Sequence, residues 1–309
     1  MQTTLKSHVT FTGVGLHSGK PVTMTVRPAS AEYGIWFQRT DINDRDNMIP
    51  ARWDAVGFTT LCTQIENADG VTVATIEHLM AALAGCGIHN ALVEIDGPEV
   101  PALDGSSAQY VRAFINRGFQ ELDAPVRAIE ILKPVTFRDG EAEATLMPAQ
   151  SLEIQFEIDF PDAAIGHQEK HLNMANGSFV RELCDSRTFC RKVDIDVMQE
   201  RGLALGGDIV NKVNAVVFDG DQVLSRGGLR HSDEPVRHKM LDALGDLYLA
   251  GAPILGRYVG NRAGHAITNK LLRALFDTPD AFRMVTCDQA LSAHLPGVGV
   301  KVADLRAVA

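Results

Sequence analysis

The stretch PVRHKMLDALGDLYLAG, residues 235–251, decides the fold of the second half of this chain because it reads as one amphipathic helix. Its leucine, methionine and tyrosine side chains recur at helical spacing and form an apolar surface. A spacing of four residues places His238, Asp242 and Asp246 on a polar stripe beside that surface. An imidazole and a carboxylate at i and i+4 can bind one zinc ion, although an isolated pair of this kind is usually a solvated helix face.

Further helices and strands are predicted on both sides of this stretch. Helices are expected at 75–85 and at 266–276, and another is expected to end at Gly118 after a cap at Asp104, Ser106 or Ser107. Strand patterns mark residues 20–28, 90–97, 127–138, 143–148, 151–160 and 214–220. The strands NALVEIDG and NAVVFDG resemble each other, but the echo is too short to prove an internal duplication. Because strands and helices are grouped and do not strictly alternate, an α+β layout is favoured.

The chain of 309 residues is longer than one compact core usually covers, so two domains with a cleft between them are expected. A boundary is predicted near residue 125, in ELDAPVRAIEIL, where a helix has ended, a proline interrupts and new strands begin. The predicted domains are therefore 1–125 and 126–309.

Composition excludes several classes of protein. The net charge of -10 argues against a general nucleic-acid or membrane-surface binder. The N-terminus lacks a signal-peptide pattern, and no apolar run approaches the roughly 18 residues of a membrane helix. We therefore expect a cytoplasmic protein without a transmembrane segment. Five cysteines without a CxxC pair are interpreted as reduced thiols and not as a zinc cluster.

Two segments outside the long helix carry further candidates for chemistry. Glu77 and His78 stand near the start of the helix at 75–85, where the helix dipole stabilises an acid. Taken alone, this pair is weak evidence, since it also fits a capping acid beside a half-exposed histidine. The zinc-protease patterns HExxH and HxxEH are absent, so a classical zinc-protease assignment lacks support. His265 lies between a glycine and a helix start, a position that often presents a side chain to a cleft.

Two other segments are interpreted as carrying no cofactor. HQEKH, residues 167–171, has two histidines four apart, but its flanks indicate a solvated polar loop. TGVGLHSG, residues 12–19, does not meet the GxGxxG spacing of a nucleotide-binding loop.

Seven motifs occur in one order along nearly the whole chain: TGVGLHSG, TIEHLMAALAG, VPALDGSS, SRTFC, RGLALGG, VRHKMLDALGD and GHAITNKLL. Together they resemble the UDP-3-O-acyl-N-acetylglucosamine deacetylase family of lipid A biosynthesis. The resemblance implies two two-layer sandwich domains, each a β-α-α-β repeat, with the active site between them. It also implies a zinc amidohydrolase that converts the acetamide of UDP-3-O-[(3R)-3-hydroxyacyl]-N-acetylglucosamine to the free amine and acetate, the committed step of the pathway. A monomer is expected, although the sequence leaves the oligomeric state open.

The resemblance also implies which residues act. One Zn²⁺ per chain, with Fe²⁺ as the alternative metal, would be held by His78, His238 and Asp242. Proton transfer would fall to Glu77 as the base and to a cationic His265 oriented by Asp246, with Thr188 and Lys239 as further contacts near the scissile carbonyl.

Contacts to the rest of the substrate are implied less directly. Candidates for the uridine and sugar are Asp159, Phe160 and Phe189, and those for the diphosphate are Lys239 and Arg262, each weighed evenly against ordinary surface or core placement. The acyl chain would occupy a tunnel in an insert at about 190–214, lined by Ile195, Val197, Leu203 and Leu205. Charged Arg191 and Lys192, and a GGDIVNKVN segment longer than expected, leave the acyl-chain length open.

Two other functions remain open at this point. One is a zinc-stabilised carbohydrate-binding or regulatory protein without turnover. Glu77 and His265 argue against it, since a structural zinc takes a fourth protein ligand and needs no added acid and base. The other is a related zinc deacetylase that acts on a different N-acetyl sugar.

Overall fold

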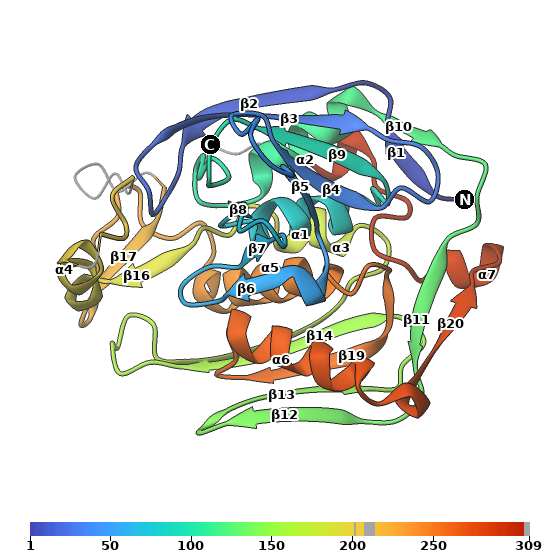
Figure 1. Cartoon of the computed structure of the whole chain (residues 1–309). Coiled ribbons are helices and arrows are strands. Elements are labelled where there is room, and N and C mark those ends of the chain that lie inside the picture. Colours follow the sequence, from blue (N-terminus) through green and yellow to red (C-terminus); the bar gives the residue numbers. More distant parts are fainter. Residues whose placement is uncertain (201, 207–213, 306–309) are drawn as a thin grey trace.

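The computed structural model describes residues 1–200, 202–206 and 214–305 of the chain. Two sheets form its outer layers, and helices α1 (Glu77–Gly85) and α5 (Glu234–Tyr248) pack against each other between them (Figure 1). The predicted α+β class is confirmed by this arrangement. The elements up to residue 121 are called the first unit, and those from residue 127 onward the second unit.

The first sheet is built from the N-terminal part of the chain. Its strands run in the order β2 (Val9–Val14), β3 (Pro21–Pro28), β9 (Ala91–Ile95), β4 (Ile35–Arg39) and β5 (Met48–Pro50). Alternate residues of β3 and β9 are buried, because successive side chains of a strand point to opposite faces. Helices α1 and α2 (Ala108–Arg117) lie on its inner side (Figure 1).

The second sheet has seven strands. Their path is β12 (Val135–Asp139), β13 (Ala142–Met147), β19 (Ile254–Asn261), β11 (Arg127–Ile131) and β20 (Phe282–Thr286), with β14 (Leu152–Asp159) beside β19 and β15 (His167–Asn173) beside β14. Helix α5 contacts β14 and β15, and α6 (His265–Phe276) contacts β12 and β13. The helices therefore cover the inner face of this sheet as well.

Smaller elements complete the two units. Strands β1 (Thr3–Leu5) and β10 (Phe119–Glu121) pair, and two three-stranded sheets join β6 (Val56–Phe58), β7 (Gln64–Glu66) and β8 (Thr72–Val73), and β16 (Phe189–Arg191), β17 (Val216–Asp219) and β18 (Gln222–Val223). The remaining helices are α3 (Ser178–Glu182), α4 (Lys192–Glu200) and α7 (Gln289–Ser292), with 3-10 turns η1 (Trp53–Ala55), η2 (Pro279–Ala281) and η3 (Val302–Asp304).

Several predicted boundaries shift for local reasons. The helix expected at 75–85 begins only at Glu77, because Thr75 has a φ of 59° that a helix cannot contain. The strand run at 127–138 is two strands, since Pro134 lacks the N–H that a ladder needs. Helices α5 and α6 each begin one residue earlier than predicted.

The prediction of a loop at HQEKH is wrong, because residues 167–171 belong to strand β15. β15 pairs in antiparallel fashion with β14, and the sequence pattern did not reveal this hydrogen bonding between strands. The histidines lie on the exposed face, where His167 and His171 are 3.0 and 3.1 Å from Glu157 and Glu153. The polar, solvated character was therefore predicted correctly, and the conformation was not.

Helices α1 and α5 cross at unusually close range where Gly245 faces α1. A Cβ atom at Gly245 would lie 2.1 Å from the backbone oxygen of Glu77 and 3.1 Å from the backbone nitrogen of Ala81. Only a residue without a side chain allows this approach. The crossing brings the segments around residues 77–81 and 238–246 together.

A second close approach joins the loop after β2 to the segment 203–206. The backbone N–H groups of Leu205 and Gly206 donate to the carbonyl oxygens of His17 and Leu16 at 3.2 and 3.0 Å. A Cβ at Gly206 would lie 1.9 Å from the Gly15 oxygen. This main-chain contact holds residues 205 and 206 of the predicted insert against the first unit.

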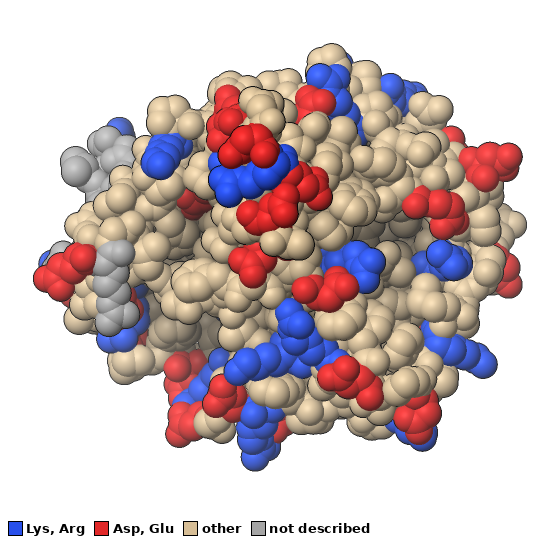
Figure 2. All heavy atoms as spheres, in the orientation of Figure 1, with Lys and Arg blue, Asp and Glu red and all other residues tan. Residues whose placement is uncertain are grey.

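Charged side chains of both signs lie side by side on the face shown in Figure 2. Exposed ion pairs such as Arg52–Asp54, with a nitrogen–oxygen distance of 2.8 Å, contribute little stability because water screens them. In the described part of the chain, no helix has the length and apolar character needed to span a membrane.

Candidate metal and catalytic site

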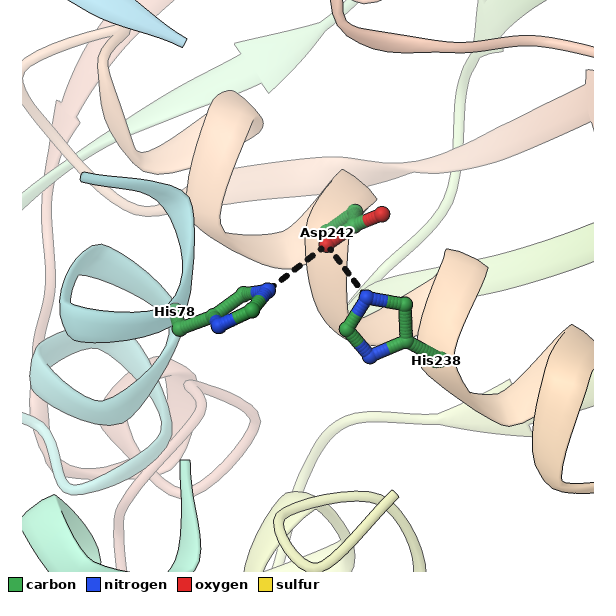
Figure 3. A group of neighbouring side chains, drawn as sticks. All are labelled: His78, His238 and Asp242. Atoms are coloured by element: carbon green, nitrogen blue, oxygen red, sulfur yellow. Dashed lines mark ion pairs between the residues drawn. The ribbon is translucent and has the colours of Figure 1, made fainter. Parts of the chain in front are cut away.

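Three buried side chains converge where α1 crosses α5. Figure 3 shows His78 approaching from α1, while His238 and Asp242 come from successive turns of α5. Asp242 Oδ1 lies 3.5 Å from His78 Nε2 and 3.3 Å from His238 Nε2. Ligand atoms about 2.0–2.1 Å from a tetrahedral ion lie roughly 3.3 Å apart, so this spacing suits one zinc ion.

The hydrogen bonds around the three residues also suit a metal. His238 Nδ1 lies 3.1 Å from the carbonyl of Ser186, which can only accept, so Nδ1 carries the proton and Nε2 keeps its lone pair. Asp242 Oδ1 is buried and has no hydrogen-bond partner among the described residues. Lys239 Nζ donates to the other oxygen, Oδ2, at 2.8 Å. An unpartnered carboxylate oxygen facing two imidazole nitrogens is what a cation would satisfy.

The electrostatics of His238 and Asp242 favour the forms that bind a metal, whereas Asp242 and Glu77 raise the pKa of His78 against the effect of its burial. Burial lowers the pKa of His238 to about 4, despite the opposing charge of Asp242, and keeps the imidazole neutral. Burial alone would raise the pKa of Asp242, but His238 and Lys239 outweigh it and hold that pKa well below its usual range. A neutral imidazole and an ionised carboxylate are both ligand forms.

Two further titratable groups lie beside this cluster. Glu77, next to His78 on α1, is 3% exposed, and its Oε1 is 3.9 Å from Nε2 of His265. His265 begins α6 and places Nδ1 2.8 Å from Oδ2 of Asp246. His265 thus has the Glu77 carboxylate of α1 near one ring nitrogen and the Asp246 carboxylate of α5 near the other.

The pKa values of Glu77 and His265 move upward for different reasons. Burial raises the pKa of Glu77, against the opposing influence of His265 and His78. Burial would lower the pKa of His265, but Asp246, Glu77 and Asp242 outweigh it and raise the pKa to about 9. His265 is therefore held as a cation between carboxylates.

These groups line a cavity of about 630 Å³ that both units enclose. Leu16, His17, Thr75, Glu77 and His78 come from the first unit, and His238, Lys239, Asp242, Thr188 and His265 come from the second. The backbone of Thr188 is fixed by hydrogen bonds to Gly105 and Val216, both at 2.8 Å. Residues far apart in sequence therefore face one space large enough for a small organic ligand.

The predicted substrate contacts divide into two groups. Phe160, Phe189 and Ile195 line the cavity, and the rings of Phe160 and Phe189 stack edge to face with centroids 5.5 Å apart. Arg262 instead binds Asp159 at 2.6 Å, and neither side chain is among the described residues that line the cavity. Each of them directly precedes, in sequence, a residue that does line it.

The predicted tunnel residues also divide. Val197 and Leu203 line the cavity beside Ile195, whereas Leu205 is 54% exposed and is not among the described lining residues. Arg191, an unexpected charge at sequence level, pairs with Asp162 and with Asp194. Residues 201 and 207–213 of the predicted insert, including most of GGDIVNKVN, lie outside the described residues.

Two residues near the site were missed by sequence analysis. His17 lines the cavity, and both of its ring nitrogens are buried without a hydrogen-bond partner in the described part of the chain. Thr63 donates its backbone N–H to Glu77 and its hydroxyl to Asp246. The histidine of TGVGLHSG was a usable signal for the first, whereas nothing in the sequence around Thr63 marks the second.

A buried ion pair secures the start of α5. Glu234 accepts from the backbone N–H and the side chain of Arg187 at 3.0 and 2.9 Å, and from the backbone N–H of Arg230 at 2.7 Å. Arg230 in turn binds Asp104 of the first unit at 2.9 Å. Burial would raise the pKa of Glu234, but the hydrogen bonds from Arg187 outweigh it and lower that pKa.

Glu234→Gln is expected to lower the free energy of unfolding at pH 7 by about 3–5 kcal/mol, because it leaves the buried Arg187 guanidinium without its carboxylate. Folding lowers the pKa of Glu234 from its ordinary value of 4.5. The difference in unfolding free energy between the two proteins is therefore largest above pH 4.5 and disappears as the pH falls through the folded-state pKa. Urea unfolding of both proteins across that pH range measures it. Glu141→Gln, in a surface pair with Arg262, is the control with little effect, and a pH-independent difference for Glu234→Gln would contradict the assignment.

The sequence matches the family described as LpxC: UDP-3-O-acyl N-acetylglycosamine deacetylase over residues 2–277. That range includes both sheets except the last strand, and all three candidate ligands. The match therefore covers the structural framework of the site and the site itself.

Similar proteins named UDP-3-O-acyl-N-acetylglucosamine deacetylase occur in several bacteria. One from Phenylobacterium zucineum (strain HLK1) is 48% identical over 291 residues, which cover 94% of this chain and 98% of the relative. One from Pseudoalteromonas atlantica (strain T6c / ATCC BAA-1087) is 44% identical over 297 residues, 96% of each chain. One from Pasteurella multocida (strain Pm70) is 43% identical over 289 residues, 93% of each chain.

Proposed function

Since the chain belongs to the UDP-3-O-acyl N-acetylglycosamine deacetylase family, we propose that it removes the acetyl group from an acylated UDP-N-acetylglucosamine, using a zinc ion held by His78, His238 and Asp242. Water and the acetamide would give acetate and the free amine, the lipid A step of the family. The observation that carries the metal assignment is the buried Asp242 Oδ1, unpartnered among the described residues and facing two histidine nitrogens.

Zinc bound by this set would polarise the amide carbonyl and lower the pKa of a water molecule toward about 7. Fe²⁺ is the alternative, because geometry and availability as well as affinity select the metal. In a catalytic site three protein ligands leave a position open to water or substrate, and this cluster has three.

Glu77 and His265 are proposed to move the protons. Glu77 is the base that takes a proton from the attacking water, since burial raises its affinity for a proton. His265, held as a cation by Asp246, stabilises negative charge on the carbonyl oxygen and gives its proton to the departing amine. Lys239 and Thr188 are proposed as further contacts to the reacting amide, because both line the same cavity.

The substrate is proposed to extend across the cavity between the domains 1–125 and 126–309. Phe160 and Phe189 offer apolar faces for the sugar and base, and Ile195 begins the apolar path for the acyl chain. Asp159 and Arg262 are proposed for the uridine and the diphosphate, which requires their mutual ion pair to open. A cytoplasmic, monomeric enzyme is part of the same proposal.

Metal content and turnover of the purified protein test this function. The expected result is one metal ion per chain, activity lost on chelation and restored by Zn²⁺, and hydrolysis of the acylated UDP-sugar in preference to UDP-N-acetylglucosamine. Equal turnover of the two sugars would instead indicate a deacetylase of other N-acetyl sugars. Bound metal without turnover of either would indicate a binding protein.

A further inference from the structure

We propose that Thr63 is a positioning residue for this reaction, because it fixes the orientation of both carboxylates that serve proton transfer. The inference rests on the proposed function and adds a residue to the same site. Thr63 lies in the loop between β6 and β7 and is 1% exposed. It therefore acts through the residues it contacts.

The first carboxylate is Glu77. The backbone N–H of Thr63 donates to Oε2 at 3.0 Å, and the N–H of Ile76 donates back to the Thr63 carbonyl at 3.3 Å. The other oxygen, Oε1, is left facing His265. Because Glu77 cannot turn without losing the bond to Oε2, the oxygen that faces the reacting groups is determined.

The second carboxylate is Asp246. The hydroxyl of Thr63 donates to Oδ1 at 2.6 Å, while Oδ2 lies 2.8 Å from Nδ1 of His265. A hydrogen bond to a buried charge is stronger than one between neutral groups, so it holds Oδ1 of Asp246 and leaves Oδ2 for the imidazole. Thr63 belongs to the first unit and Asp246 to α5, so the bond also joins the two units.

The shape of the loop supports a specific role. The chain turns at Leu61, which has a φ of 69°, a conformation that a branched side chain rarely adopts. Thr59, Thr60 and Leu61 line the cavity, and two residues later Thr63 is buried beneath the carboxylates. Strain of this kind persists only where surrounding bonds hold it, and the bonds of Thr63 are among them.

Thr4 is a buried threonine whose hydroxyl only satisfies a hydrogen bond in the core, so it can be compared with Thr63. Thr4 is 2% exposed, and its hydroxyl donates to the backbone oxygen of Asn90 at 2.7 Å. Its acceptor is neutral and belongs to the first unit alone. Thr63 differs because both of its acceptors are carboxylates that face His265.

Thr63→Val removes the hydroxyl and keeps the shape of the side chain. We expect kcat to fall about 10–100-fold, as when other groups that orient an active site are removed, with KM and metal content unchanged. Thr63→Ser, which retains the hydroxyl, is expected to restore most of kcat. Thr4→Val is the matched control, and it should reduce stability while leaving kcat as in the wild type.

A double-mutant cycle with Asp246→Asn supplies a second readout. If the hydroxyl acts through Asp246, Thr63→Val should lower kcat much less in the Asp246→Asn background than in the wild type. Should Thr63→Val fail to fold, Thr63→Ala removes the same hydroxyl with less volume and is compared with Thr63→Ser.

Three results would overturn the proposal: a wild-type kcat for Thr63→Val, a loss of activity that only follows loss of metal, or a Thr63→Ser variant as impaired as Thr63→Val. The proposed function fails separately. A wild-type protein without deacetylase activity refutes the function, whereas an active wild type with inactive Glu77→Gln and unimpaired Thr63→Val refutes the role of Thr63 alone.

Discussion

Glu77→Gln is expected to lower kcat about 10²–10⁴-fold while the protein keeps its metal, because the amide fits the same space but cannot accept the proton of water. The glutamine oxygen can still accept from the N–H of Thr63, so the surrounding structure should persist. Asp242→Ala should differ from Glu77→Gln because it lowers the metal content, since it removes one of three ligands.

The measurement is metal content beside steady-state kinetics for the wild type, Glu77→Gln, His265→Ala and Asp242→Ala. His265→Ala should resemble Glu77→Gln, with metal retained and kcat reduced. Glu130→Gln, at a surface pair with Arg283, is the control for removal of a carboxylate outside the cavity. A Glu77→Gln enzyme with nearly wild-type kcat would remove Glu77 from the role of base and leave the metal site unaffected.

Gly245→Ala is expected to weaken the metal site although no ligand is changed. At an open helix position this substitution would stabilise the protein by about 0.5–1 kcal/mol. Here the new Cβ would lie 2.1 Å from the Glu77 backbone oxygen, and a backbone atom cannot rotate away. Helices α1 and α5 must separate, which carries His78 away from His238 and Asp242.

We expect Gly245→Ala to cost about 1–3 kcal/mol of stability through overpacking. Metal affinity should fall about 10–100-fold, as when groups that orient ligands are disturbed. Urea unfolding and titration of the metal-free protein with Zn²⁺ measure the two effects. Gly264→Ala, where no atom lies within 4 Å of the new Cβ, is the control for metal affinity. A Gly245→Ala protein that binds zinc normally and unfolds at higher urea would show that the helices can relax.

The same crossing explains how much the sequence could predict. The spacing of His238 and Asp242 lies within one helix, so a period of four residues revealed it. Nothing in that period tells which other helix supplies the third ligand, because His78 arrives through a contact between two units. The resemblance of seven motifs provided that assignment, and the structure brings the three side chains together.

The structural features that the sequence did not predict also have physical explanations. Strand β15 was predicted as a loop because an edge strand with one exposed face needs few apolar residues. Thr63 and Asp246 are 183 residues apart, and a single hydrogen bond across that separation produces no repeating pattern in the sequence. Arg262 and Asp159 were assigned to the substrate one at a time, whereas the fold pairs them.

The contact between residues 15–17 and 205–206 has a consequence for how the cavity can evolve. Its hydrogen bonds run from main chain to main chain, so any residue except proline could occupy position 205 and donate in the same way. Leu203 and Ala204, which line the cavity next to this contact, carry none of these bonds. Substitutions at 203 can therefore resize the wall of the cavity while the scaffold that holds the wall stays in place. Position 204 is more restricted, because its φ of 54° disfavours large or branched side chains.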